Sequence, residues 1–416
     1  YCYADSGMGE STTDMVFAGH RLICENGAKL AESSLFTLGL TMADVDVERL
    51  AQDRRKMNTW HSADDEDVYF VEFSYSEKTI EKFQLRRSIS PTPFVPGGEA
   101  IFDRCAAIVR MQAAGLTTRL SHIGAKTAVL ALSGGLDSTL ALLITAEAFR
   151  ILGLPNSGIK TVSMPCFGTT GRTKNNAESL ARKLGVNFRE ISIEKSVRQH
   201  FADIGHDISV TDVTYENSQA RERTQVVMDI ANQEGGIVIG TGDLSELALG
   251  WATYNGDHMS MYGVNASVPK TLVRHLVRYF ADQFEGEIGA ILLDILDTPV
   301  SPELLPPRDG EISQKTEALV GPYELHDFFL YYLLRFGFAP NKIYHMACIA
   351  FKEQYEEEEI KKWLRVFYKR FFSQQFKRSC LPDGPKVGSV TLSPRGDFRM
   401  PSDACANAWL QVIDHL

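Results

Sequence analysis

The chain has 416 residues, of which 44% are hydrophobic and 23% are charged, and its formal net charge is −10. This length allows two to three ordinary domains, and the composition is typical of a globular protein with a sizeable core. The negative charge argues against a large nucleic-acid surface, and no apolar run approaches the length that spans a bilayer. We therefore expect neither a nucleic-acid partner nor a membrane partner.

The cysteines indicate a cellular compartment. Seven are present, and no two of them form a C-x-x-C pair. The odd count and the spacing argue against a disulfide framework or a zinc site and predict a reducing, cytoplasmic location. The N-terminus shows no signal peptide. It begins Tyr-Cys-Tyr-Ala without an initiator methionine, so we expect a fragment or a processed product.

The first part of the chain predicts short strands. Asn26-Gly27, between residues 21–24 and 28–30, is a hairpin signal. Residues 68–73, Val-Tyr-Phe-Val-Glu-Phe, also show an alternating pattern. Residues 90–98 then hold three prolines and two glycines, which predicts a linker over residues 86–100 and a domain boundary there.

After the linker the pattern changes to an alternation of strands and helices. Apolar runs that suit buried parallel strands lie at residues 127–132, 159–164, 188–193 and 236–240. Helices are expected from about Ser138, over residues 172–184 and over residues 215–233. Such repeated units predict a doubly wound parallel sheet, followed by a mainly helical C-terminal region. Because ligands bind outside the carboxyl ends of such strands, the candidate loops are residues 133–138, 164–172 and 241–246.

The strongest motif is Ser-Gly-Gly-Leu-Asp-Ser at residues 133–138, between a strand and its helix. The two glycines let the backbone approach an anion closely, and the helix N-terminus adds free N–H groups and a positive dipole end. Asp137 can hold a hard cation such as Mg²⁺. The alternative is a tight turn in which Asp137 or Ser138 caps the helix.

Two further motifs follow. Residues 240–246 end the fourth strand, and Glu246 could complete a cation site with Asp137. Alternatively, Asp243 and Glu246 form a capping box that needs no ligand. Arg221 and Arg223 lie on the helix over residues 215–233, where a surface ion-pair face is the alternative to a site.

The hexapeptide resembles the pyrophosphate loop of the ATP pyrophosphatase (PP-loop) family. Together with residues further along, it resembles the NAD synthetases, and in particular their glutamine-dependent branch. The resembling segments are residues 130–139, 219–225, 240–271, 321–325 and 376–403.

The resemblance implies ATP-dependent amidation of nicotinic acid adenine dinucleotide (deamido-NAD) to NAD by a carbon–nitrogen ligase. An acyl-adenylate forms, and AMP and pyrophosphate are released. The fold implied is an adenine nucleotide alpha hydrolase-like α/β domain that binds ATP as a substrate and Mg²⁺ as a cofactor.

Site residues are implied in the same way. Those implied to bind ATP are Ser133, Gly134, Gly135, Leu136, Asp137, Ser138 and Thr241. Those implied to ligate Mg²⁺ are Asp137 and Glu246, and the catalytic set is Asp137, Glu246 and Lys270. Those implied to bind the dinucleotide are Asn217, Arg221, Glu246, Trp251, Ala252, Thr253, Tyr254 and Lys377. The alternatives are that Trp251 and Tyr254 are core aromatics and that the lysines are solvated.

Residues 1–85 resemble the closing part of a nitrilase-type glutaminase domain, an α/β sandwich that works by a Glu–Lys–Cys triad. All three triad residues are expected upstream of Tyr1, and Cys24 is interpreted as a structural residue of the hairpin. This chain alone is therefore expected to use free ammonia, whereas a complete parent protein would take it from glutamine. The predicted domains are residues 1–85, a linker at 86–100 and the synthetase domain at 101–416. The resemblance also implies a homo-oligomer.

Other functions remain open at this point. Another PP-loop amidoligase, such as a GMP- or asparagine-forming enzyme, is the first alternative, although those lack the pattern over residues 240–270. A catalytically inactive nucleotide-binding module is the second. A tRNA-thiolating relative would want paired catalytic cysteines and a basic face, and neither is visible. A nitrilase-like amidase fails because the triad is missing.

Overall fold

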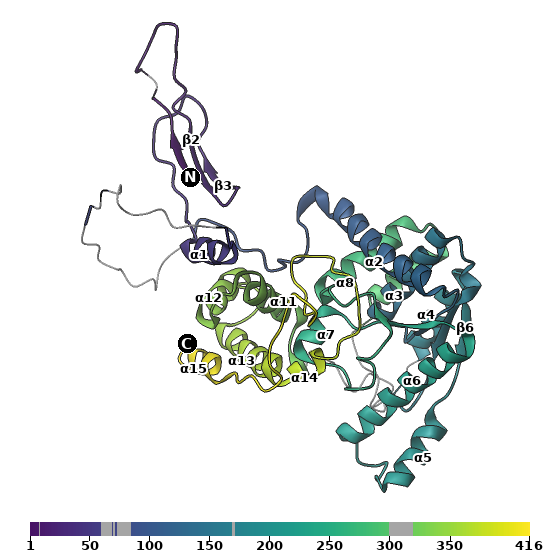
Figure 1. Ribbon diagram of the computed structural model, residues 1–416. Helices are drawn as coiled ribbons and strands as arrows, with labels where there is room; N and C mark the ends of the chain where they lie inside the picture. Colours follow the sequence, from purple (N-terminus) through teal and green to yellow (C-terminus); the bar gives the residue numbers. More distant parts are fainter. Residues whose placement is uncertain (8, 60–68, 70, 73–84, 169–170, 299–318) are drawn as a thin grey trace. The chain divides into compact units, whose positions relative to one another are not determined.

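The computed structural model describes residues 1–7, 9–59, 69, 71–72, 85–168, 171–298 and 319–416 (Figure 1). The chain forms two compact units. One comprises Tyr1–Ser90 with Phe336–Phe338, and the other comprises Pro91–Arg335 with Ala339–Leu416.

The first unit contains a small antiparallel sheet with the order β1-β2-β3. Its strands are β1 (Cys2–Ala4), β2 (Arg21–Glu25) and β3 (Ala28–Glu32), and helix α1 (Val47–Lys56) follows. Asn26 and Gly27 join β2 to β3 with φ of 47° and 80°, the left-handed pair that a two-residue hairpin turn requires. The predicted hairpin is therefore confirmed. The strand pattern at residues 68–73 falls largely outside the described residues.

The second unit is built on a five-stranded sheet in which every pairing is parallel. Its order is β6-β5-β4-β7-β8, so the chain starts in the middle, adds two strands on one side and then two on the other. The strands are β4 (Ala128–Ala131), β5 (Ile159–Ser163), β6 (Asn187–Glu190), β7 (Ile237–Gly240) and β8 (Tyr262–Gly263). This confirms the predicted doubly wound sheet. Strand β8 was not predicted, since two residues carry no readable pattern.

Helices make up most of the rest of this unit. They are η2 (Gly98–Ala100), α2 (Ile101–Ile123), α3 (Leu136–Leu152), η3 (Asn156–Gly158), α4 (Gly171–Lys183), α5 (Glu194–Ile204), α6 (Val213–Glu234), α7 (Leu244–Leu249), α8 (Lys270–Gln283), α9 (Glu287–Leu296), α11 (Tyr323–Tyr331), the π-helical turn η4 (Tyr332–Phe336), α12 (Pro340–Ala350), α13 (Glu357–Ser373), α14 (Gln375–Arg378) and α15 (Asn407–Asp414). In the described part of the chain, none of them is both long and apolar enough to cross a bilayer.

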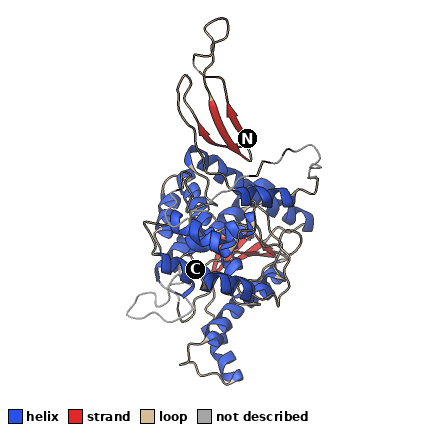
Figure 2. Ribbon diagram, turned by 90° about the vertical axis from the view of Figure 1, so that its left-hand side faces the viewer, coloured by secondary structure: helices blue, strands red, loops and turns tan. Residues whose placement is uncertain are grey.

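Helices cover both faces of the parallel sheet (Figure 2). Ala128 and Leu130 of β4 point into a core shared with α2, α3, α8 and α9, whereas Val129 points into a second core shared with α5 and α6. Figure 1 shows α2 and α3 on one side of the sheet and α5 and α6 on the other. This two-sided burial explains why the strands read as continuous apolar runs.

The helical C-terminal region packs beside the loops that follow the strands. Helix α11 contacts both α7 and α8, and α13 also contacts α7. Residues of α11, α13 and α14 are therefore brought next to the carboxyl end of the sheet. The predicted helical C-terminal addition is confirmed, and it contributes directly to the candidate site.

Candidate functional site

The turn after β4 is held by its own serines. The Ser133 hydroxyl accepts the N–H of Gly135 at 3.2 Å and lies 3.1 Å from the Ser138 hydroxyl, which donates to the Gly135 carbonyl at 3.1 Å. Gly134 has a φ of +87°, and a Cβ at this position would lie 2.1 Å from the Thr173 carbonyl oxygen. Only glycine therefore fits here.

The N-terminus of α3 is open to an anion. Its N-cap is Gly135, and no side chain among the described residues caps it. The alternative in which Asp137 or Ser138 caps this helix is thus not what the structure adopts. The first-turn amides and the positive end of the helix dipole remain available to a bound phosphate or carboxylate.

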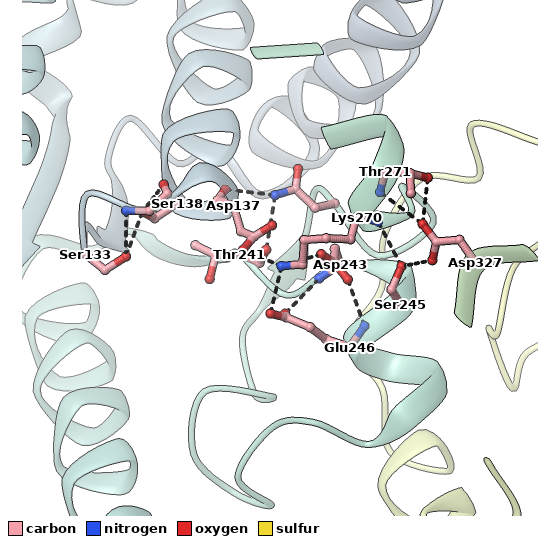
Figure 3. Close-up of polar contacts among 12 residues, drawn as sticks. Ser133, Asp137, Ser138, Thr241, Asp243, Ser245, Glu246, Lys270, Thr271 and Asp327 are labelled. Carbon is pink, nitrogen blue, oxygen red and sulfur yellow. Dashed lines mark hydrogen bonds and ion pairs between the residues drawn. The ribbon is translucent and has the colours of Figure 1, made fainter. Parts of the chain in front are cut away.

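Lys270 lies among three carboxylates at the carboxyl end of the sheet (Figure 3). Its Nζ is 2.7 Å from Asp137 Oδ2, 2.7 Å from Asp243 Oδ2 and 3.0 Å from Glu246 Oε1. Asp243 is fully buried and Lys270 is only 3% exposed. The four groups come from the starts of α3, α7 and α8, which the fold brings to one point.

Burial shifts the protonation of this cluster. It raises the pKa of Asp243 well above the usual value, and it raises the pKa of Glu246 to about 7, in each case against the opposing charge of Lys270. Burial alone would lower the pKa of Lys270, but the three carboxylates hold it well above its usual value. The lysine is therefore charged, and the carboxylates outnumber it.

This excess of carboxylate oxygen suits a hard divalent cation. Asp137, Asp243 and Glu246 each offer an oxygen, and these atoms all lie within 4.8 Å of one another. Asp137 Oδ1 is buried and has no hydrogen-bond partner among the described residues. Cations such as Mg²⁺ take oxygen ligands of this kind, so the donor set fits.

Asp243 and Glu246 serve two purposes at once. The capping box is present: Asp243 Oδ1 accepts the N–H of Glu246 at 2.8 Å, and Glu246 Oε2 accepts the N–H of Asp243 at 3.4 Å. The remaining oxygens face Lys270. The two interpretations of this motif are therefore compatible, and Asp243 joins the cluster although the sequence placed only Asp137 and Glu246 there.

A buried amide ties the two strand-end loops together. Asn265 Nδ2 donates to the carbonyl of Asp137 at 3.0 Å and to the carbonyl of Thr241 at 3.1 Å. Gln112 of α2 orients this amide by donating to its Oδ1 at 3.1 Å. The loops after β4 and β7 are thus fixed relative to each other, which holds Asp137 near Glu246.

A cavity of about 650 Å³ opens beside the cluster. The sequence-predicted residues that line it are Ser133, Gly135, Leu136, Asp137, Ser138, Asn217, Thr241, Glu246, Trp251, Ala252, Thr253, Tyr254 and Lys377. Three others do not: Gly134 packs against Thr173, Lys270 is buried behind the carboxylates, and Arg221 is exposed.

One helix contributes both arginines that the sequence singled out. Arg221 donates from Nε to the Tyr254 carbonyl at 3.3 Å, whereas Arg223 lines the cavity and donates to the Met164 carbonyl at 3.3 Å. Asn217, on the same helix, accepts the Thr253 hydroxyl at 2.8 Å and so joins α6 to the segment after α7. The cavity wall therefore contains Arg223, whereas Arg221 lies outside the lining.

Cations from α13 and α14 gather at the end of α7. Lys377 Nζ donates to the carbonyls of Gly250 and Ala252, both at 2.7 Å. Arg370 Nε donates to the Leu249 carbonyl at 3.0 Å, and its guanidinium lies 5.2 Å from the centroid of the Trp251 ring. Burial, followed by the nearby charge of Arg370, lowers the pKa of Lys377 to about 8. These contacts satisfy the free carbonyls of the helix end.

Arg370 and Asp257 are among the cavity residues that the sequence did not predict. Asp257 lies in the cavity wall, where its carboxylate accepts the N–H of Thr253 at 2.7 Å, and desolvation of the carboxyl raises its pKa. Arg370 sits in a helix whose periodicity indicates only a partly buried face. Neither stands in a motif, so no local signal could have identified them.

The close approach of Gly134 to Thr173 predicts a specific loss of stability. Gly134→Ala should lower the free energy of unfolding by about 2 kcal/mol or more, because strain and a clash with backbone combine. Gly153→Ala is the matched control, since Gly153 has a φ of +67° but an open environment, and it should lose only about 1 kcal/mol. Urea denaturation of both variants measures the difference, and equal losses would contradict the proposed contact.

Comparison with known proteins places these residues within one family. The family model described as NAD synthase matches residues 108–377. The glutamine-dependent NAD(+) synthetases of Mycobacterium tuberculosis (strain ATCC 25618 / H37Rv) and Mycobacterium leprae (strain TN) are each 44% identical to this chain, covering 100% of it. The chain spans 66% of the length of these relatives.

A solved structure supports the same fold. The crystal structure of a glutamine-dependent NAD(+) synthetase from Cytophaga hutchinsonii superposes with a TM-score of 0.61 at 18% identity. The match covers 100% of this chain and 65% of that protein. At this identity the likeness concerns the fold alone, and it agrees with the doubly wound sheet and helical additions described above.

Proposed function

Because the chain belongs to the NAD synthase family, we propose that it catalyses the ATP-dependent amidation of nicotinic acid adenine dinucleotide to NAD. The observation that carries the proposal is the composition of the cavity. It joins an uncapped helix N-terminus, the carboxylates of Asp137 and Glu246, and the cations of Arg370 and Lys377. The mycobacterial relatives named above support the same reaction.

The chemistry follows from the weakness of a carboxylate as an electrophile. A carboxylate oxygen of the nicotinate attacks the α-phosphorus of ATP, and the bond to the bridging oxygen breaks to release pyrophosphate. Ammonia then attacks the acyl carbon of the adenylate, AMP leaves, and the nitrogen loses a proton to water. Holding the two substrates in one cavity removes much of the entropic barrier.

The strand-end loops suit the phosphates of ATP. The open amides of α3 and the hydroxyls of Ser133, Ser138 and Thr241 would hold the phosphate oxygens, and the dipole of α3 would stabilise charge on the leaving pyrophosphate. Lys270 sets the positions of the carboxylates behind them. Asp137, Glu246 and Asp243 would hold Mg²⁺, which supplies Lewis-acid stabilisation of the phosphates when bound.

A second group of cavity residues suits the dinucleotide. Asn217, the segment from Trp251 to Tyr254 and Lys377 line it together, so they are proposed to bind this substrate as a group. We extend this set to Arg370, whose cation also lines the cavity. Arg221 is exposed and donates to the Tyr254 carbonyl, so its contribution would be to hold that segment.

The nitrogen source is a separate part of the proposal. Cys24 lies in strand β2 of the hairpin, with its N–H bonded to the Tyr1 carbonyl at 2.9 Å, and not at a strand-to-helix elbow. We therefore propose that this chain uses ammonia directly. Hydrolysis of glutamine is assigned to a complete parent protein with a nitrilase-type glutaminase domain.

The decisive assay combines the chain with ATP, Mg²⁺ and nicotinic acid adenine dinucleotide, and measures NAD with ammonium or glutamine as the nitrogen source. We expect NAD with ammonium alone. NAD from glutamine as well would mean that a nucleophile is present in this chain and would return attention to Cys24. A folded sample that binds ATP but makes no NAD from either source would refute the ligase and favour an inactive nucleotide-binding module.

The acidic cluster predicts a loss of turnover. Asp137→Asn should lower kcat by about 10²- to 10³-fold, because it removes a charge proposed to ligate the cation beside the phosphates. Asp282→Asn is the matched control, since Asp282 pairs with Arg278 on the exposed face of α8, and its kcat should stay unchanged. Near-normal turnover in Asp137→Asn would remove this residue from the proposed site.

The lowered pKa of Lys377 predicts that substrate binding depends on pH. Its lowered pKa of about 8 means that it is charged below this pH and neutral above it. The KM for the anionic dinucleotide should therefore rise as the pH is raised from 7 to about 9. In Lys377→Arg, whose charge persists, this rise should disappear. A KM that rises equally in both proteins would assign the effect to another group.

A further inference from the structure

Asp327 of helix α11 is a buried carboxylate outside the cavity, and the mechanism above does not use it. It is only 1% exposed. Its Oδ1 accepts the hydroxyl of Ser245, and its Oδ2 accepts both the N–H of Thr271 at 3.0 Å and the Thr271 hydroxyl at 2.6 Å (Figure 3). Three donors from two other helices therefore converge on this one side chain.

The donors belong to the two turns that carry the charged cluster. Ser245 immediately precedes Glu246 in the first turn of α7, and Thr271 immediately follows Lys270 in the first turn of α8. The Ser245 hydroxyl also accepts the N–H of Lys270 at 2.8 Å. A continuous path of hydrogen bonds thus runs from Asp327 to the backbone of Lys270.

Helix α8 needs such partners because it has no local cap. Its N-cap is Pro269, which offers no side-chain acceptor, so the first amides would be unsatisfied inside the protein. Ser245 and Asp327 satisfy the N–H groups of Lys270 and Thr271 instead. A carboxylate at this end of the helix also faces the positive end of its dipole, which stabilises both.

A second contact from the same helix supports this arrangement. Tyr323 lies one turn before Asp327 on α11, and its ring centroid is 5.2 Å from the Nζ of Lys270. Residues four apart share one face of a helix. One face of α11 therefore contacts Lys270 twice, at its ammonium through Tyr323 and at its backbone through the Asp327 path.

We propose that Asp327 is a positioning residue, which holds the first turns of α7 and α8 in the register that places Glu246 and Lys270 against Asp137. It acts through Ser245 and Thr271 and touches no substrate. This inference rests on the proposed function. The helical addition is accordingly part of the catalytic framework. It supplies Asp327, where the hydrogen-bond path from the backbone of Lys270 ends.

The expected effect falls on turnover and leaves substrate binding nearly unchanged. Asp327→Asn keeps the size of the side chain but cannot accept all three donors, so the turns of α7 and α8 should shift slightly. Small misplacements of this kind cost about 10- to 100-fold in kcat. The KM for ATP should change less than about threefold, because the phosphate-binding amides of α3 are untouched.

The test compares four proteins: Asp327→Asn, Ser245→Ala, the double variant and the control Glu324→Gln. Glu324 lies on α11 and accepts the Tyr355 hydroxyl at 2.7 Å, away from the cluster, so its variant loses a charge on the same helix and should keep the kcat of the wild type. Because Ser245 and Asp327 act along one path, the double variant should be no slower than the slower single variant. Additive losses, or an equal loss in Glu324→Gln, would overturn the proposal.

Amide hydrogen exchange separates this inference from the proposed function. In Asp327→Asn, exchange should become faster over the first turns of α7 and α8, while the rest of α8 keeps its protection. This measurement does not require turnover. If the wild-type chain made no NAD, the proposed function would fail while exchange still decided the role of Asp327. Unchanged protection at Lys270 and Thr271 would refute the positioning role.

Discussion

The ion cluster around Lys270 is the constraint on which the site depends. One buried ammonium meets the carboxylates of Asp137, Asp243 and Glu246 at 2.7 to 3.0 Å, and these four groups come from the starts of three different helices. Burying such charges is costly unless all of them are paired in good geometry. The cluster therefore forms only when the starts of α3, α7 and α8 converge, and it penalises any displacement of one relative to the others. The interactions that stabilise this arrangement therefore also fix the positions of the groups proposed to carry the chemistry.

The rest of the fold holds the starts of these helices in place through hydrogen bonds to their backbone. The parallel sheet delivers the loops after β4 and β7 to one edge, and Asn265 joins them by donating to the carbonyls of Asp137 and Thr241. The capping box orients the start of α7. Helix α8 follows Pro269, and its first amides are satisfied by Ser245 and by Asp327 of the helical C-terminal region. Side chains from distant parts of the chain thus complete the hydrogen bonds that the local sequence leaves open.

Under the proposed function, the two substrates are bound by differently charged groups of the cavity. The open end of α3 and the carboxylates suit the phosphates of ATP with a divalent cation. Arg370 and Lys377 suit the anionic dinucleotide, and they are held in place by the carbonyls at the end of α7. Helix α7 therefore separates the two regions, with its acidic first turn on the side of the cluster and its last carbonyls bound to cations. A reaction between a carboxylate and a nucleotide phosphate needs both environments in one cavity.

The sequence by itself determined the elements whose signals are local. The Asn26-Gly27 turn, the apolar strands and the hexapeptide after β4 could be predicted, because turn chemistry and periodicity act between near neighbours. Only the tertiary structure decided which side chains meet. Arg221 and Arg223 are two residues apart on α6, so a rotation of about 200° separates them and only one can face the cavity. The bond between Asp327 and Thr271 joins residues far apart in the chain. Such contacts depend on how whole elements pack, and no local pattern records them.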